Sequence, residues 1–319
     1  QLDFSWARVV ESTPPAKLSL MLPLDDPNLP WLGTLVGVPI LGFYFWCTNQ
    51  FIVQRVLGAR NIAHARWGAL LAGFLKLPVL YLMVFPGVMA AIFLPGLENG
   101  DTVFPTLIAT LLPAGLSGLV IAALLAAIMS SIDSTLNSAS ALLTMDFLRP
   151  EKRGWTGEQT ALAGRLGIVG FMLLAALIAP LIENFPGLFH YLQSALAYLV
   201  PPVAAVFILG LFWRGINATG AFAALLGGHG ISAFLFTLSA LDILELHFTI
   251  VAGLLAASSL LIAAVASQQG APSPDRQLAL YTARRDQLAP AAHLAWWQDY
   301  RIYCALVTGL ATLLVITHW

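Results

Sequence analysis

Charged residues are scarce in this sequence. Its 319 residues include 15 Lys and Arg and 16 Asp and Glu, so charged side chains make up 10% of the chain, against about 25% in soluble domains. Hydrophobic residues account for 59%, and the mean hydropathy is +0.82. So few charges cannot cover the surface of a water-soluble protein, and the composition therefore indicates an integral membrane protein.

Cysteine is rare as well, and the common catalytic motifs are missing. Cys47 and Cys304 both lie in apolar stretches, and we interpret them as small apolar residues rather than as a disulfide pair. The sequence contains no metal-type Cys/His cluster, phosphate-binding P-loop, GxSxG motif or dinucleotide-binding fingerprint. We therefore expect neither an enzyme nor a bound cofactor, and no nucleic acid as a partner.

Long runs without any charged residue are abundant. They comprise residues 27–54, 77–97, 102–132, 166–182, 184–213, 215–241, 246–274 and 302–319. Each is near or above the ~18–20 residues that a helix needs to cross a bilayer, and none alternates as barrel strands do. The predicted fold class is an all-α membrane protein with about eight transmembrane helices: 31–57, 67–94, 113–147, 159–182, 186–213, 217–240, 245–268 and 298–318.

The basic residues are distributed unequally between the two sides of these spans. The segments after the first, third, fifth and seventh spans hold Arg55, Arg60, Arg66, Arg149, Lys152, Arg153, Arg165, Arg214, Arg276, Arg284, Arg285 and Arg301, whereas the opposite side has only Arg8 and Lys17. The positive-inside rule then predicts a multi-pass protein of the plasma (inner) membrane, surrounded by lipid, with both chain ends outside. An even number of spans with both ends outside is unusual, so we expect that Gln1 is not the native start.

Polar groups at membrane depth are costly and tend to mark function. Lys76 lies about ten residues into its span, ~15 Å deep, which is too deep for its ammonium to reach the interface easily. It either lines a polar cavity or pairs with a structural acid within the helix bundle. The stretch 43–55 places Thr48, Asn49 and glutamines after a run of aromatics, which suits a polar, uncharged ligand; the alternative is an aromatic belt at the interface, although Trp46 is far into the span.

A third polar region, residues 126–140, crowds serines, a threonine, an asparagine and Asp133 onto one predicted helix. Ala127, Ser130 and Ser131 stand at i, i+3 and i+4, so hydroxyls and any freed carbonyl share one face. Uncharged oxygen ligands suit a monovalent cation that must bind and leave. Packing of small residues between helices explains the same composition, and both interpretations remain open. A fourth region contributes Gln193 in mid-helix.

Four blocks of this sequence resemble the sodium/solute symporter family, and specifically its sodium/glucose cotransporter branch. They read FWCTNQFIVQRVLGARN, ARWGALLAGFLKLPVLYLMVFPGV, AAIMSSIDSTLNSASALLTMDFL and YLQSALAYLVPPVAAVFILGLFWRGINATGAF. The resemblance implies a leucine-transporter-type fold of two inverted repeats, with substrate and sodium bound between broken helices at mid-membrane. On this mapping the chain supplies the second repeat and accessory helices, while the N-terminal repeat is missing or lies on another chain.

The mapping also implies a division of the chain. Residues 1–30 form an outer loop, 31–213 the second repeat of five helices, 214–268 two accessory helices, 269–297 a cytoplasmic linker and 298–319 the last helix.

Residue by residue, the resemblance implies two sites. Lys76 and Gln193 match residues that hydrogen-bond the sugar, and Trp46 matches a tryptophan beside the pocket, near Phe45 and Asn49. The carbonyl of Ala127 and the hydroxyls of Ser130 and Ser131 match the sodium site; the remaining ligands come from the first repeat. Sodium is then the coupling ion and no other cofactor is implied.

Three positions depart from the family pattern. Phe45 stands where a gating tyrosine is common, His190 replaces an aspartate, and Asp133 replaces a threonine. Asp133 and Ser134 either belong to a second cation site or Asp133 pairs with a basic group. The predicted function is sodium-coupled symport of a hexose-like sugar by alternating access. The alternatives are a symporter of a charged or amino-acid-like solute and a membrane sensor that does not transport.

Overall fold

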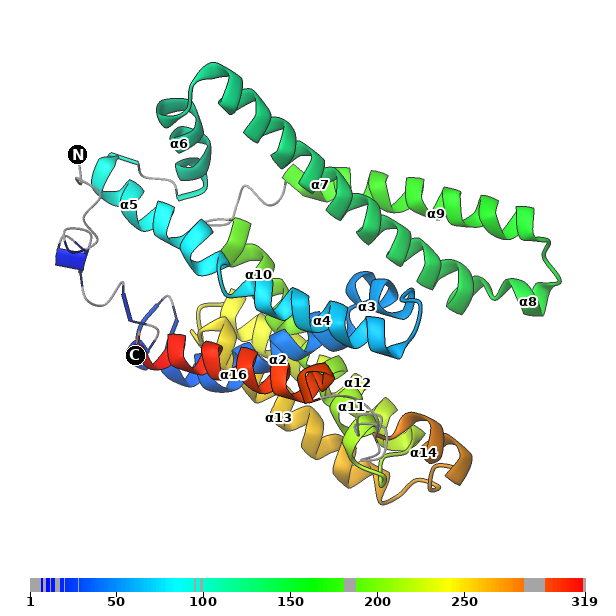
Figure 1. Cartoon of the computed structure of the whole chain (residues 1–319). Helices are drawn as coiled ribbons and strands as arrows, with labels where there is room; N and C mark the ends of the chain where they lie inside the picture. The colour runs from blue at the N-terminus through cyan, green and yellow to red at the C-terminus, as the bar shows by residue number, and fades with distance from the viewer. Residues whose placement is uncertain are drawn as a thin grey trace. The chain divides into compact units, whose positions relative to one another are not determined.

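The structure is a computed structural model that describes residues 29–94, 96–97, 100–180, 188–283 and 296–317, and residues 7, 10–11, 13–14, 18–19 and 21–27. Within these ranges the regular structure is helical, apart from an isolated bridge between Leu22 and Pro30, and no strand forms (Figure 1). The prediction of an all-α protein is confirmed.

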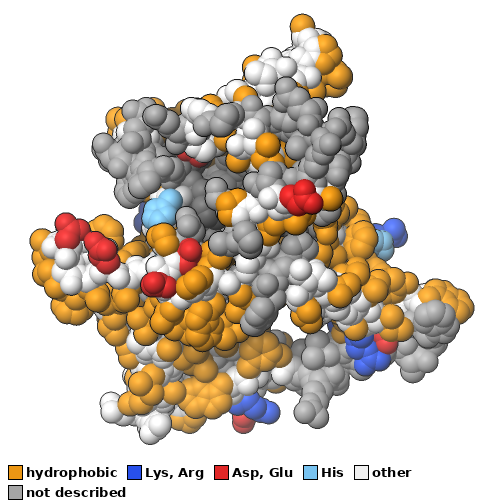
Figure 2. Space-filling model, turned by 90° about the vertical axis from the view of Figure 1, so that its left-hand side faces the viewer, with side chains coloured by type: hydrophobic (Ala, Val, Ile, Leu, Met, Phe, Trp, Pro, Cys, Tyr) orange, Lys and Arg blue, Asp and Glu red, His pale blue; other side chains and the backbone are white. Residues whose placement is uncertain are grey.

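The membrane-spanning helices agree in order with the predicted spans. In the described part of the chain, seven helices are long and apolar enough to cross a membrane: Trp31–Thr48, Ile62–Ile92, Ala114–Leu148, Gly157–Ile178, Ala218–Ala240, Phe248–Ser267 and Tyr300–Thr317. Two further helices, His190–Leu199 and Pro201–Phe212, are bent by 52° relative to each other. If this bent pair is counted as one span, the described residues contain eight candidate spans. Hydrophobic side chains dominate the described surface in Figure 2, and Leu57, Phe147 and Leu177 are 77–78% exposed, as suits contact with lipid.

The first predicted span is interrupted rather than continuous. Helix α2 (Trp31–Phe43) passes into the π-helical turn η2 (Tyr44–Thr48), and α3 (Gln50–Leu57) follows. Asn49 between them is extended, with ψ 118°, and its side chain accepts a hydrogen bond from the Phe51 N–H at 3.4 Å. The side chain thus caps the new helix, which explains why the 31–57 helix ends early.

The second span is also irregular. Helix α4 (Ile62–Lys76) is followed by the π-helical turn η3 (Leu80–Val84) and α5 (Phe85–Phe93). Pro78 lies at the interruption, where it has no N–H to continue the ladder.

The remaining helices are α6 (Val103–Leu111), α7 (Ala114–Leu142), α8 (Pro150–Arg153), α9 (Gly157–Ile178), α10 (Leu188–Leu199), α11 (Pro201–Phe212), α12 (Ala218–Ala240), α13 (Phe248–Ser267), α14 (Asp275–Tyr281) and α16 (Tyr300–Thr317). The chain forms two compact units: Gln1–Leu82 with Leu192–Trp319, and Met83–Tyr191.

Helix α13 is the core of the first unit, where it packs against α2, α11 and α12. One face of α12 consists of small residues at every fourth position, all buried: Gly220, Ala224, Gly228 and Ser232. A Cβ added to Gly220 would lie 1.9 Å from Ser267 Oγ, and one added to Gly228 would lie 2.3 Å from Ser259 Oγ. The two helices therefore approach closely because small residues line both sides, as in other membrane helix pairs.

Asn217 anchors the start of α12 to the end of α13. Its side chain accepts from the Gly220 N–H at 3.0 Å and donates to the Ser267 carbonyl at 2.7 Å, with only 5% of the residue exposed. We expect Asn217→Ala to lower the free energy of unfolding in detergent by about 2 kcal/mol, because a cap and a buried hydrogen bond are lost together.

Asn61 provides the matched control for this prediction. It caps α4 by accepting from the His64 N–H at 2.9 Å, but on an exposed surface. Asn61→Ala is therefore expected to cost about 1 kcal/mol or less. Equal losses in the two variants would contradict the role assigned to the buried bond to Ser267.

Aromatic and cationic side chains join α4 to α16. The Arg66 guanidinium lies 4.5 Å from the centre of the Tyr300 ring, and Trp67 and Tyr303 meet edge to face at 4.9 Å. Just before α16, Asp299 accepts from Arg301 at 2.8 Å, and this hydrogen bond holds the pKa of the Asp299 carboxyl below its usual value.

The second unit is built around an antiparallel pair, α7 and α9, which lie side by side in Figure 1. The π-helical turn η5 (Leu143–Leu148) extends α7, and Ser140 Oγ donates to the Gly164 carbonyl of α9 at 2.6 Å. Arg149, with φ 50°, ends η5, and Gly154, with φ 65°, ends the short helix α8 that follows. Thr156 and Gln159 then form a capping box that starts α9.

Some predicted features lie outside the described residues. They include most of the outer loop before residue 21, most of the linker after residue 283, and the side chains of Arg8, Lys17, Arg284 and Arg285.

Candidate functional site

Lys76 is the last residue of α4, at the point where the span is interrupted before Pro78. Its side chain is exposed, and it forms no ion pair with any residue that the structure describes. An ammonium group has three donors and no acceptor, so a partner must supply oxygen atoms. Its place beside irregular backbone resembles the broken helices that line binding cavities in transporters.

The aromatic residues Phe45 and Trp46 belong to the π-helical turn η2. The Phe45 ring meets Trp46 and Phe51 edge to face, with 5.9 Å between centroids in both pairs, and is half-buried. Trp46 is 38% exposed, so its indole face remains accessible. Asn49 is half-buried and occupied as the cap of α3, a structural task that the sequence analysis did not assign to it.

Gln193 lies on α10, and its side chain is half-buried. Lys76, Trp46 and Gln193 belong to the same compact unit but to three different elements. None of the described ring, ion-pair or hydrogen-bond contacts joins any two of them directly. The structure thus places the predicted substrate residues near two helix breaks and one bend.

The predicted sodium ligands share one face of α7 in the second unit. The Ser131 hydroxyl donates to the Ala127 carbonyl at 3.0 Å, and both residues are exposed, as is Ser130. A serine oxygen keeps lone pairs for a cation while it donates its hydrogen. One helix face therefore presents a carbonyl and two hydroxyl oxygens, which is an incomplete shell for a hard cation.

The same face becomes buried toward the end of α7. Ser134 is half-buried and donates to the Ser130 carbonyl at 2.8 Å, and Ser138 is buried and donates to the Ser134 carbonyl at 2.7 Å. Near the end of the helix, Ser140 packs against α9. Asp133 is exposed and makes no ion pair within the described residues. Packing thus accounts for Ser140, whereas the oxygens near Ser131 are accessible, and a cation site there stays a prediction.

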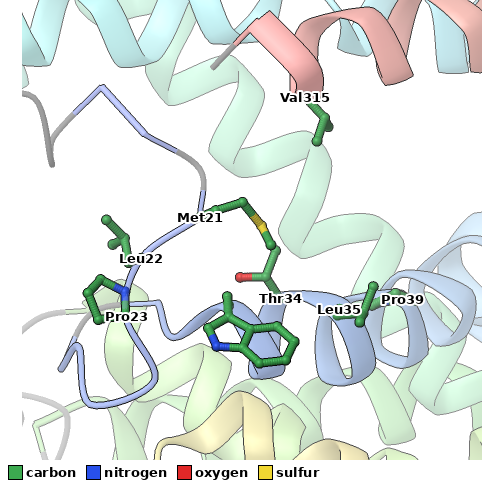
Figure 3. A pocket seen from close by; sticks show the side chains of 8 residues that line it. Met21, Leu22, Pro23, Thr34, Leu35, Pro39 and Val315 are labelled. Atoms are coloured by element: carbon green, nitrogen blue, oxygen red, sulfur yellow. The ribbon is translucent and has the colours of Figure 1, made fainter. Parts of the chain in front are cut away.

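A groove of about 640 Å³ occurs elsewhere in the first unit (Figure 3). Val315 of α16 faces Met21 and Thr34 across it, and the other lining residues are Leu22, Pro23, Trp31, Leu35 and Pro39. Its lining is almost entirely apolar, so it does not suit a sugar. The sequence gives no sign of this groove, because apolar side chains around a span carry no local signal of a cavity. Among the described residues no group of three His, Cys, Asp or Glu could hold a metal ion.

These observations define a multi-pass membrane protein with broken helices and polar side chains at membrane depth. Residues 7–228 match the sodium:solute symporter family, so the chain belongs to this family of transporters, which are not enzymes. Several curated relatives are similar to it over part of their length.

The human sodium/myo-inositol cotransporter 2 is 38% identical over 220 residues, which is 63% of this chain and 33% of the relative. The sodium/mannose cotransporter of Bos taurus is 39% identical over 225 residues, 65% of this chain and 38% of the relative. The sodium/myo-inositol cotransporter of Canis lupus familiaris is 33% identical over 233 residues, 67% of this chain and 32% of the relative. The chain thus spans about a third of the length of the curated relatives it matches.

Proposed function

We propose that this chain is part of a sodium-coupled symporter of a hexose-like sugar or a cyclic polyol. The observation that carries the proposal is its similarity to cotransporters named for sodium with myo-inositol or mannose, at 38% and 39% identity. Both named solutes are small, uncharged rings of hydroxyl groups. The proposed location is the plasma (inner) membrane.

The substrate residues suit such a solute chemically. Lys76 offers three donors to hydroxyl oxygens, and the Gln193 amide can donate and accept. The Trp46 indole offers an apolar face for the C–H side of the ring, with Phe45 packed at its edge. Asn49 stays in this proposed site as the residue that fixes the helix break beside Trp46.

Sodium is the proposed coupling ion, bound at the α7 face of Ala127, Ser130 and Ser131. Because these residues supply only part of a shell, we propose that an N-terminal repeat outside this chain supplies the other ligands. Asp133 and Ser134 are the proposed contributors to a second cation site. An ion that falls through ~100 mV releases about 2.3 kcal/mol, which supports roughly fiftyfold accumulation of solute.

The test is uptake by the complete transporter that contains this chain, reconstituted in proteoliposomes. An inward sodium gradient is expected to drive accumulation of labelled myo-inositol, mannose or glucose, whereas an equal potassium gradient is not. If sodium drives uptake of proline or a carboxylate but of no sugar or polyol, the proposed substrate class is wrong. Absence of uptake for every solute would overturn the symport proposal itself.

The sodium site makes a separate prediction. Ser131→Ala removes one hydroxyl ligand, so the sodium concentration that gives half-maximal uptake is expected to rise about tenfold. Thr237→Ala is the matched control, since its hydroxyl bonds to the Ala233 carbonyl at 2.8 Å on an exposed face of another span. If both variants reach half-maximal uptake at the same sodium concentration, Ser131 is not a ligand of the sodium site.

A further inference from the structure

The bend between α10 and α11 leaves backbone carbonyls at membrane depth without donors from their own helix. Pro201 and Pro202 have no N–H, so the carbonyls of Ala197 and Tyr198 lose the donors that a continuous helix would provide. The helices bend by 52° at this point, and Leu199 ends α10. Unpaired carbonyls are costly in a membrane, so other groups must satisfy them.

Two side chains of α12, one turn apart, face carbonyls at this break: one is the Tyr198 carbonyl, and the other is the next carbonyl along the chain, that of Leu199. Ser232 Oγ donates to the Tyr198 carbonyl at 2.6 Å, and His229 Nε2 lies 3.2 Å from the Leu199 carbonyl oxygen. Ser232 is buried and His229 is half-buried. Together they fasten the end of α10 to the middle of α12.

Both ring nitrogens of His229 face acceptors. Its Nδ1 lies 2.7 Å from the Leu225 carbonyl oxygen, and carbonyl oxygens only accept hydrogen bonds. A neutral imidazole has one N–H, so it can satisfy only one of the two contacts. The imidazolium has two N–H groups and satisfies both.

Among the residues that the structure describes, the helices packed around His229 hold no charged group that accounts for this arrangement. Helices α11 and α13, which pack on α12, have no charged or titratable residue, and His229 is the only one on α12. On α10 the nearest titratable group is the Tyr198 phenol, whose ring stacks edge to face on Phe236; Tyr191 and His190 lie about two turns earlier.

We propose that His229 is a proton-binding site that latches the end of α10 to α12. Proton binding adds a hydrogen bond and closes the latch, and proton release opens the contact either to Leu199 or to Leu225. Because Gln193 lies on the same helix, the latch sets the position of this residue; only that last consequence rests on the proposed function.

Hydrogen exchange at the bend tests the latch without any transport measurement. The Val200 and Ala204 amides, which donate to Leu196 and Val200, report its opening. In the complete transporter, His229→Gln keeps an amide donor at every pH but cannot gain a proton. At about pH 5.5 these amides are expected to exchange about tenfold faster in His229→Gln than in the wild type, and at about pH 8 within about twofold.

Ser232→Ala is the control, because it removes the neighbouring contact but no titratable group. It should speed exchange by the same factor at both pH values. A ratio for His229→Gln that does not change with pH would overturn the proposal, as would an equal pH dependence in Ser232→Ala. If His229→Gln does not fold, protection of the same amides in the wild type, measured relative to those in the middle of α13, must still rise as the pH falls.

Discussion

Replacing Lys76 with alanine is expected to lower sodium-driven uptake of sugar or polyol at subsaturating concentration by about 10- to 100-fold. The ammonium is exposed at the end of α4 and forms no ion pair with a described residue, so its donors are available to a solute. A hydrogen bond to a charged group contributes about 1.5–3 kcal/mol, which corresponds to this range. Uptake of labelled myo-inositol and mannose into proteoliposomes measures the effect.

Lys152→Ala is the matched control, since Lys152 is equally exposed but lies on the short helix α8 between two spans. It should transport as the wild type does. The charged-solute alternative makes a different prediction for Lys76: uptake would be competed by carboxylates rather than by hexoses. Normal sugar uptake by Lys76→Ala would contradict the proposed pocket while leaving the family assignment intact.

The spans could be predicted from the sequence because charge-free, apolar runs of this length are typical of membrane-spanning helices. The interruptions were harder to predict. Residues 31–57 were predicted as one continuous span, yet the helix breaks at Asn49, because a side-chain amide can cap a new helix within a membrane span. The composition of a span is an average over many residues, so it does not predict a break that depends on a single side chain.

The candidate site was predicted in part only. Spacing alone placed Ala127, Ser130 and Ser131 on one face, and the helix α7 confirms that arrangement. Whether Lys76, Trp46 and Gln193 meet depends on how separate helices pack, which local sequence patterns do not encode. The contacts of His229 depend on a carbonyl that is 30 residues away in sequence and freed by a bend.

Gly37→Ala is expected to lower the free energy of unfolding by about 3 kcal/mol, although it adds only one methyl group. A Cβ at Gly37 would lie 1.9 Å from the Thr249 carbonyl oxygen and 2.7 Å from its carbonyl carbon. These are backbone atoms of α13, which cannot rotate aside as a side chain can. The helices must therefore separate, and the cost is that of overpacking a close helix contact. Thermal unfolding in detergent measures the loss.

Gly42→Ala in the same helix isolates the cause, because a Cβ there would meet no atom within 4 Å. Alanine favours the helix over glycine by up to about 1 kcal/mol, so this variant should be as stable as the wild type or more so. The expected changes in the free energy of unfolding differ in sign only because of position, since the two substitutions are chemically identical. Equal stability of the two variants would mean that α2 does not approach α13 as closely as Gly37 permits.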